Sequence, residues 1–266
     1  MRLAIFSNVQ GNIVALDAVL AALEPRDPAK ILAVGDIVGL GPSPNAVVDR
    51  LRDHEIEAVA GNYDDAVAFD RLSPGMDYAN EGTERAERQL LAWTRRTLSE
   101  ENLAYLRDLP RDLRVFEFGP RGQVRRNMRD PDEPSAGGML MRALFGGLIR
   151  DRRPSRRKQA LVAHGTPRAL NEYVRADTAV SILETIATVT RADVLISGHG
   201  GEGFQREAAG MTFVGAPSVA GPQMPLGEAG YGIVDLGPEI TTEFFTVEYD
   251  IGEYQRHVAE RGLPIG

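Results

Sequence analysis

Ile31-Leu-Ala-Val-Gly-Asp-Ile-Val-Gly-Leu-Gly-Pro42 is the stretch of sequence that decides the fold. Its first four residues are a short apolar run typical of a buried strand, and a glycine-rich turn with one acidic side chain follows directly. Two further apolar runs have the same form: Leu3–Phe6 is followed by polar Ser7–Asn12, and Glu57–Ala60 by Gly61–Asp65. Ligands of α/β proteins bind beyond the carboxyl ends of strands, so these polar segments are the first place to look for a site.

Helical patterns separate the three strand candidates. Apolar residues with helical spacing predict one helix over residues 13–23, and a second is expected near Pro44–Arg52. Strands that alternate with helices indicate βαβ units and a parallel or mixed sheet. Residues 81–108 are predicted to be helical in two pieces, with Ser99 as the N-cap of the second.

The second half of the chain predicts more strands, at Arg114–Phe118, Gln159–Ala163 and Asp193–Ile196, and a helix at Ala179–Thr190. After Gly203, short strands at 211–214, 231–236 and 241–247 suggest an antiparallel meander that forms a second sheet. The expected fold class is α/β, with two facing mixed β-sheets flanked by helices.

The composition excludes several classes of protein. Of the 266 residues, 43% are hydrophobic and 26% charged, which is typical of a globular chain. The absence of cysteine excludes disulfide scaffolds, thiolate metal sites and thiol catalysis. No apolar run reaches the length of a membrane span, and Asn8, Gln10 and Asn12 interrupt any signal-peptide core, so a cytoplasmic protein is expected.

A basic segment interrupts the expected single domain of residues 1–266. The net charge is −8, yet residues 121–158 carry eleven Lys/Arg against four Asp/Glu, so this segment is +7 and the remainder −15. We treat 119–158 as an insertion with two open interpretations: a solvated loop, or a lid that recruits phosphate through arginines such as Arg142 and Arg150.

The apolar run Met139–Ile149 within the insertion is compatible with a short amphipathic helix. Such a helix would cover the site, or it would seat a partner or a second copy of the chain in a homo-oligomer. Nucleic-acid binding is not expected, because the segment offers Phe145 as its one aromatic residue for base stacking.

Four polar residues at strand ends have the chemistry of a metal site. Asp36, Asn62, His164 and His199 would supply one carboxylate, one amide oxygen and two imidazoles, a set suited to one Mn, Fe or Zn ion. Taken singly each has a simpler explanation, since Gly-Asp is common in turns and Asn62 alone suits an Asx-turn. The four together, each at the end of a predicted strand, favour the metal site.

The order of these motifs resembles the calcineurin-like metallophosphoesterases, in particular the small bacterial and archaeal predicted phosphodiesterases. The family pattern runs Asp-x-His-Gly-Asn, Gly-Asp-x-Val-Gly-Tyr-Gly-Pro, Gly-Asn-His-Asp, His-Gly and Gly-His-x-His. The chain matches it at Gly11-Asn12, Gly35-Asp36, Val38-Gly39, Gly41-Pro42, Gly61-Asn62, Asp64, His164-Gly165 and Gly198-His199. The resemblance covers nearly the whole chain except the insertion, and it implies an αββα sandwich with two metal ions.

Carried over position by position, the resemblance leaves one metal site complete and the other depleted. The second metal would keep Asp36 as the bridging carboxylate, with Asn62, His164 and His199. At the first metal, Asn8 stands for Asp, Gln10 for His and Gly201 for the last His. A second metal is therefore not expected, because divalent cations depend on such charge and imidazole donors.

Two more positions follow from the resemblance. Tyr63 stands where the family has a His that binds phosphate and protonates the leaving group. A phenol with a pKa near ~10 is a poorer acid at neutral pH than an imidazole near ~6.5, although it can still hydrogen-bond a phosphate oxygen. Asp64 is expected to orient its neighbours, whereas Asp65 is expected to be a helix N-cap.

Three functions remain open. The first is a metal-dependent phosphoesterase that acts through a single metal, with Asp36, Asn62, Tyr63 and His164 as catalytic residues, on a phosphorylated small molecule or nucleotide. The second is an inactive relative that binds such a ligand as a regulatory module. The third is an oxygen-activating iron site built on two histidines and a carboxylate.

Overall fold

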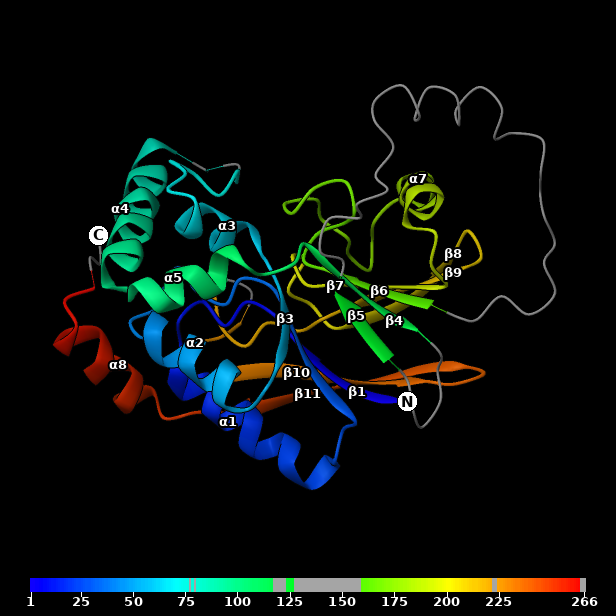
Figure 1. Ribbon diagram of the computed structural model, residues 1–266, viewed down its shortest axis with the longest axis horizontal. Helices are drawn as coiled ribbons and strands as arrows, with labels where there is room; N and C mark the ends of the chain where they lie inside the picture. The colour runs from blue at the N-terminus through cyan, green and yellow to red at the C-terminus, as the bar shows by residue number, and fades with distance from the viewer. Residues whose placement is uncertain (77, 79, 117–122, 127–158, 222–223, 264–266) are drawn as a thin grey trace.

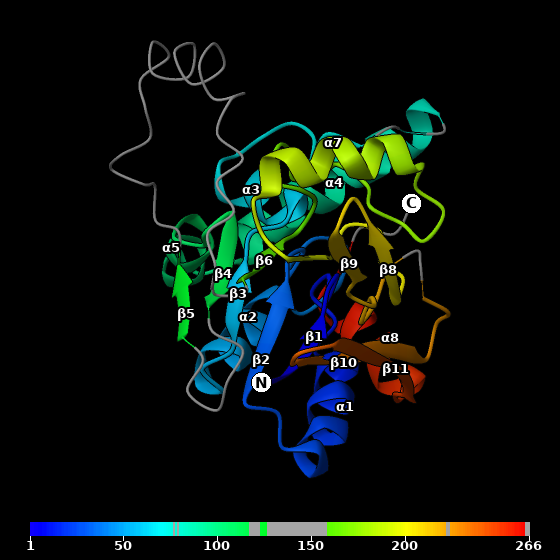
Figure 2. The same ribbon diagram turned by 90° about the vertical axis from the view of Figure 1, so that its right-hand side faces the viewer.

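The computed structural model describes residues 1–266 except 77, 79, 117–122, 127–158, 222–223 and 264–266 (Figure 1). Two sheets lie face to face, with helices outside both (Figures 1 and 2). This arrangement confirms the predicted fold class.

The first sheet has the strand order β11-β10-β1-β2-β3. Its parallel centre pairs β1 with β2 and β2 with β3, while β10 and β11 add an antiparallel hairpin beside β1. The register places Ile5 beside Leu32 and Ala33 beside Ala58. The strands are β1 (Arg2–Phe6), β2 (Lys30–Val34), β3 (Glu57–Val59), β10 (Glu228–Leu236) and β11 (Ile240–Glu248).

The second sheet has the order β5-β4-β6-β7-β9-β8. Strands β6, β7 and β9 are parallel, and β4, β5 and β8 run antiparallel to their neighbours. Its strands are β4 (Asp112–Phe116), β5 (Gln123–Arg126), β6 (Gln159–Ala163), β7 (Val194–Ser197), β8 (Phe204–Ala208) and β9 (Met211–Gly215).

Successive side chains of a strand point to opposite faces of its sheet, and this alternation divides the core into three layers. In β1, Leu3 and Ile5 point into the space between the sheets, whereas Ala4 and Phe6 face the helices that cover the first sheet. The second sheet repeats this pattern, because Val162 packs between the sheets and Leu161 packs toward α7. Strands covered on both faces need apolar residues at every position, which is why they appear as unbroken apolar runs in the sequence.

The helices predicted near residues 13–23, 44–52, 81–108 and 179–190 are confirmed. Ser99 caps α5 through a hydrogen bond from the Asn102 amide, as expected, and Asn12 caps α1 through one from the Ala15 amide. The helices are α1 (Ile13–Leu23), α2 (Pro44–Asp53), α3 (Asn62–Ala68), α4 (Glu81–Thr97), α5 (Glu100–Arg107), α7 (Val180–Thr190) and α8 (Ile251–Glu260), with a 3-10 turn η1 (Glu24–Arg26).

The predicted C-terminal meander is wrong. Hairpin β10–β11 joins the first sheet beside β1, while β8 and β9 form the edge of the second sheet. Local patterns show where strands occur, but pairing with the distant β1 is decided by the face that each strand buries. The expected cap at Asp65 is also wrong, since α3 begins at Asn62 after the N-cap Gly61.

The predictions for the insertion mostly lie outside the described residues. This holds for the 139–149 helix and for Arg142 and Arg150, while residues 123–126 form β5 beside β4. Among the helices that the structure does describe, none combines the length and apolar character that crossing a bilayer requires.

Candidate metal centre

The site lies where five parallel strands end. After β1, β2 and β3 come the segments that carry Asn8, Asp36 and Asn62, and after β6 and β7 come His164 and His199. Backbone hydrogen bonds join these segments, from the Asn8 amide to the Gly35 carbonyl and from the His199 amide to the His164 carbonyl. The carboxyl edges of both sheets therefore build one site, as expected from the sequence.

Glycines in these turns are required by close packing. A Cβ at Gly35 would stand 2.5 Å from His164 Nδ1, and one at Gly61 would stand 2.1 Å from Asp36 Oδ1. Asp36 itself has a φ of 55°, in the left-handed region that Asp tolerates better than most residues. The glycine of the Gly-Asp pair is thus required by the approach of the second sheet, and the glycine of the Gly-Asn pair by the neighbouring turn after β2.

The four predicted metal ligands converge. Candidate ligand atoms of Asp36, His164 and His199 all lie within 4.8 Å of one another. The Nε2 atom of His164 is 3.0 Å from Asn62 Oδ1, 3.1 Å from His199 Nδ1 and 3.4 Å from Asp36 Oδ2. All four side chains are buried, and four donor atoms at one point fit a single divalent transition metal.

The hydrogen bonds of His164 prepare it to bind a metal. Its Nδ1 lies 2.7 Å from the Val34 carbonyl, which can only accept, so Nδ1 carries the proton and the Nε2 lone pair faces the cluster. His199 presents Nδ1 to the same point, and its Nε2 is buried without a hydrogen-bond partner among the described residues. A metal ion at this point would accept the lone pairs of His164 Nε2 and His199 Nδ1 at once.

The electrostatics of the cluster distinguish the two histidines. Burial and repulsion by His164 lower the pKa of His199 to about 4, so this ring is neutral at physiological pH. Burial also disfavours the charged form of His164, but the neighbouring Asp36 carboxylate outweighs it and raises the pKa of His164 above its ordinary value. A cation bound here would compete with the proton that Asp36 favours on His164.

Asp64 holds the two turns that carry Asp36 and Asn62. It is fully buried and accepts hydrogen bonds from the Val38 amide (3.0 Å) and the Gly61 amide (2.8 Å), so it orients its neighbours as expected. Burial, followed by repulsion from Asp36, raises the pKa of Asp64 to about 6. Two backbone donors justify a carboxylate here, since a neutral side chain would satisfy only one of them.

Gln10 contacts the carboxylate that would bridge two metals. Its Nε2 donates to Asp36 Oδ2 at 3.1 Å, and its Oε1 accepts from the Leu40 amide at 3.2 Å. The Leu40 bond fixes the orientation of the carboxamide, because an amide N–H needs an acceptor. Gln10 therefore presents an N–H donor to Asp36, and its oxygen faces the Leu40 amide.

Asn8 likewise presents its amide nitrogen to the protein. Nδ2 donates to Ser218 Oγ (2.8 Å), Ser7 Oγ (3.2 Å) and the Gly198 carbonyl (3.2 Å). Ser218 also donates its backbone amide to the Gly201 carbonyl, which places the Asn8 and Gly201 segments side by side. Where the resemblance placed the first metal, the chain has amide hydrogen bonds.

Tyr63 contributes its backbone to the site. Its amide donates to Asp36 Oδ1 at 2.9 Å, while its ring is buried and packs in the apolar cluster of the helical layer. Burial and the nearby Glu87 carboxylate raise the pKa of Tyr63 far above the usual range. This phenol is therefore an even weaker acid than the sequence indicated, and its contact with substrate stays a prediction.

An aromatic stack over His199 was missed by the sequence analysis. The Tyr173 ring lies 4.2 Å from the His199 ring, and the Arg175 guanidinium lies 4.3 Å above the Tyr173 ring. Both residues are in the irregular segment between β6 and α7, which has no motif of its own. One hint of their orientation was available: Tyr173 and Arg175 lie on either side of the buried Val174, and so on the opposite face from it.

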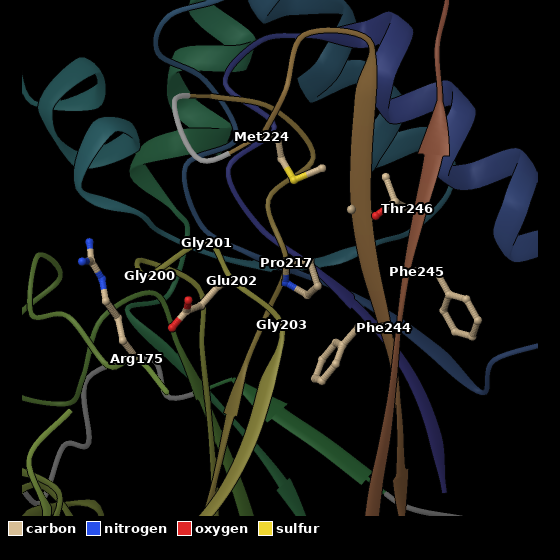
Figure 3. A pocket seen from close by; sticks show the side chains of 11 residues that line it. Arg175, Gly200, Gly201, Glu202, Gly203, Pro217, Met224, Phe244, Phe245 and Thr246 are labelled. Carbon is tan, nitrogen blue, oxygen red and sulfur yellow. The ribbon is translucent and has the colours of Figure 1, made fainter. Parts of the chain in front are cut away.

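Two hollows are lined by residues at or next in sequence to the metal ligands. One, of about 480 Å³, lies between residues 200–203 and the β10–β11 hairpin, with Arg175 at one side (Figure 3). The other, of about 330 Å³, has Asn62 in its wall and three arginines in its lining: Arg71, Arg111 and Arg168. In this second hollow Arg71 pairs with Asp65 and Arg168 with Glu172, whereas Arg111 has no ion pair among the described residues.

Comparison with known proteins agrees with this architecture. A family model described as calcineurin-like phosphoesterase matches residues 1–200. The crystal structure of a metallophosphoesterase from Sphaerobacter thermophilus is similar over 99% of this chain and 95% of that one, at 25% identity and a TM-score of 0.64. Hypothetical protein PH1004 from Pyrococcus horikoshii OT3 covers 99% and 94%, at 20% identity and a TM-score of 0.70, and shows the fold alone.

One curated relative matches part of the chain. The uncharacterized protein MJ0912 of Methanocaldococcus jannaschii is 36% identical over 108 residues, which are 41% of this chain and 42% of that protein. The match thus spans less than half of that relative's length.

Two facing sheets with a cluster of metal ligands at their carboxyl edge define the class as a metallophosphoesterase-like αββα protein. The chain belongs to the calcineurin-like phosphoesterase family. This membership confirms the resemblance of the sequence motifs.

Proposed function

We propose that this protein is a phosphoesterase that acts on a phosphorylated small molecule or nucleotide with one divalent transition metal, Mn, Fe or Zn. The observation that carries the proposal is the convergence of Asp36, Asn62, His164 and His199 on one buried point. When bound there, the metal supplies Lewis-acid activation of a phosphoryl oxygen and lowers the pKa of a bound water.

The protein's own residues position the reaction. The Val34 carbonyl fixes the His164 ring, and the Tyr63 amide holds Asp36 Oδ1, so the ligand atoms are set before substrate arrives. The arginine-lined hollow beside Asn62 favours an anionic substrate, since guanidinium is the preferred partner of phosphate. Within the described residues, Arg111 and Arg175 lack carboxylate partners and are available to phosphate.

The proposal is tested with chelator-stripped protein reloaded with Mn²⁺, Zn²⁺ or Fe²⁺. We expect one equivalent of metal by mass spectrometry, and turnover of bis(p-nitrophenyl) phosphate or p-nitrophenyl phosphate. His164→Ala should abolish both. His54→Ala is the matched control, because His54 is exposed at the end of α2 and should leave both unchanged. Loss of activity in both variants, or no metal binding in the wild type, would refute the proposal.

A second candidate is an inactive binder of the same ligands. The observation that favours it is Tyr63, whose ring is buried beside Glu87 and so supplies no competent acid for the leaving group. In that case the metal-loaded protein would retain inorganic phosphate or a nucleotide without cleaving it. Single-turnover mass spectrometry of the bound nucleotide separates the two candidates.

The remaining structural expectations belong to the same proposal. We propose that the chain is one domain, with the segment of residues 119–158 as an excursion from it. A homo-oligomer built through the apolar run 139–149 predicts a larger species by light scattering for the full chain than for a variant that lacks residues 127–158.

A further inference from the structure

The groove beside Gly200–Gly203 is built from two distant parts of the chain. One wall is the loop after β7, and the other is the β10–β11 hairpin, with Met224 and Pro217 between them (Figure 3). Phe244 points into the groove near Gly203, whereas Phe245 turns away and stacks on Tyr231 at 5.2 Å. The volume of about 480 Å³ is within the range of small-molecule sites.

Part of the groove lining directly follows a metal ligand in the sequence. Gly201 follows His199 by two residues and lines the groove, and Gly200 lies between them. Neither glycine has a side chain to separate His199 from the groove. Along the chain only Gly200 separates His199 from Gly201, which would bring a group in the groove near a phosphate held at the metal centre.

Among the described residues that line the groove, Arg175 is the one cation. Arg175 lies over Tyr173, which lies over His199, so its guanidinium is two ring layers from the metal ligand. Glu202, the acidic residue of the lining, accepts a hydrogen bond from the Ala176 amide at 2.8 Å, and no ion pair joins it to Arg175 in the described part of the chain. Arg175 is thus held in place by stacking, with its hydrogen-bond donors free for an anion.

We propose that this groove receives the organic group that esterifies the phosphate, and that this group is an aromatic ring of nucleobase or aryl size. Phe244, Met224 and Pro217 offer apolar and ring contacts, and the glycines allow a flat group to approach the backbone. Arg175, which lines the same groove, is the cation that this proposal assigns to the phosphate. The inference rests on the proposed function, because it needs the phosphate at the metal centre.

The test measures dissociation constants for the Mn²⁺-loaded full chain by calorimetry. Inorganic phosphate, methyl phosphate, phenyl phosphate and AMP are the probes, since they share the phosphate and differ in the organic group. Burial of an aromatic ring is expected to make phenyl phosphate and AMP bind at least about tenfold more tightly than methyl phosphate. Equal affinity for methyl phosphate, phenyl phosphate and AMP would overturn the inference.

Two variants locate the effect. Thr246 is exposed on β11 opposite Gly230, so Thr246→Trp fills the groove from the surface. It should remove the preference for aromatic esters and leave the affinity for inorganic phosphate unchanged. Thr241→Trp is the control, because Thr241 is exposed on the same strand outside the groove. Retention of the preference in Thr246→Trp would overturn the inference.

Arg175→Ala should weaken all four probes roughly tenfold, as loss of a hydrogen bond to a charged group does. Failure of the inference is distinguishable from failure of the proposed function. If methyl phosphate, phenyl phosphate and AMP bind equally, the metal centre still binds phosphate and only the groove assignment is wrong. If no probe binds, both are wrong.

Discussion

The double variant Asn8→Asp/Gln10→His tests whether amide hydrogen bonds stand in for a second metal. Both replacements restore the residue types that the family resemblance places at the first metal. In the wild type, Gln10 Nε2 occupies Asp36 Oδ2 at 3.1 Å, an oxygen that a second cation would need. We expect one equivalent of Mn²⁺ to bind the wild type and two to bind the variant.

The metal-free double variant should be less stable than the wild type, because it loses hydrogen bonds at both positions. Asp at position 8 would place a carboxylate oxygen near the Gly198 carbonyl, now 3.2 Å from Asn8 Nδ2, and two acceptors cannot pair. Loss of a bond to a carboxylate at position 10 costs about 1.5–3 kcal/mol, and an unpaired acceptor at position 8 about 1–3 kcal/mol. The melting temperature of the metal-free variant should fall by roughly 10 °C.

Added Mn²⁺ should reverse that loss, because ligand present at 100 times its dissociation constant stabilises by about 2.7 kcal/mol. Calorimetric titration gives the stoichiometry, and thermal melts with and without Mn²⁺ give the linked stability. A wild type that binds two equivalents, or a variant that binds one and is not rescued by Mn²⁺, would refute the role given to Gln10.

Three further predictions concern the same site. Apparent Mn²⁺ affinity should fall as the pH drops through the raised pKa of His164, toward tenfold per pH unit. Protonation of His199, whose pKa is about 4, should not compete with Mn²⁺ binding above pH 5. Calorimetry across pH 5.5–8 checks this dependence. Asp64→Asn should lower the free energy of unfolding by about 1–3 kcal/mol in urea, because one of two backbone donors loses its acceptor; no loss would contradict the bracing role. Tyr173→Ala should weaken Mn²⁺ binding because the His199 ring loses its stacking partner, whereas Tyr173→Phe should keep the affinity. Equal affinities in the two variants would show that stacking does not position His199.

The site was more predictable from sequence than the sheet partition. Asp36, Asn62, His164 and His199 each follow an apolar run, and parallel strands bring their carboxyl ends to one edge whatever their order. The same runs do not say which strand pairs with which. Hairpin β10–β11 joins β1 because Tyr231 and Ile233 pack with the helical layer while Val234 packs between the sheets, a division visible only once both sheets exist.

Residues that act through their backbone or through stacking were harder to predict. Tyr63 holds Asp36 through its amide, a contact independent of side-chain type. Tyr173 and Arg175 lie in an irregular segment, where neither strand nor helix periodicity gives a direction to the side chains. The orientation of the Gln10 carboxamide depended on the distant Leu40 amide, so its donor role could not be inferred from the residue type alone.

The residue types at positions 8 and 10 depend on one another through charge. Asp36 is a buried carboxylate whose Oδ1 already accepts the Tyr63 amide, so its Oδ2 needs a positive or donating partner on each side. One side faces the metal-ligand cluster, and Gln10 Nε2 supplies the other. A lone Asn8→Asp change would add a second carboxylate without a cation to neutralise it. A lone Gln10→His change would lose the carboxamide that the Leu40 amide orients toward Asp36, without restoring the carboxylate. Each single change should therefore be destabilising in the absence of metal, and only their combination should recover a second cation.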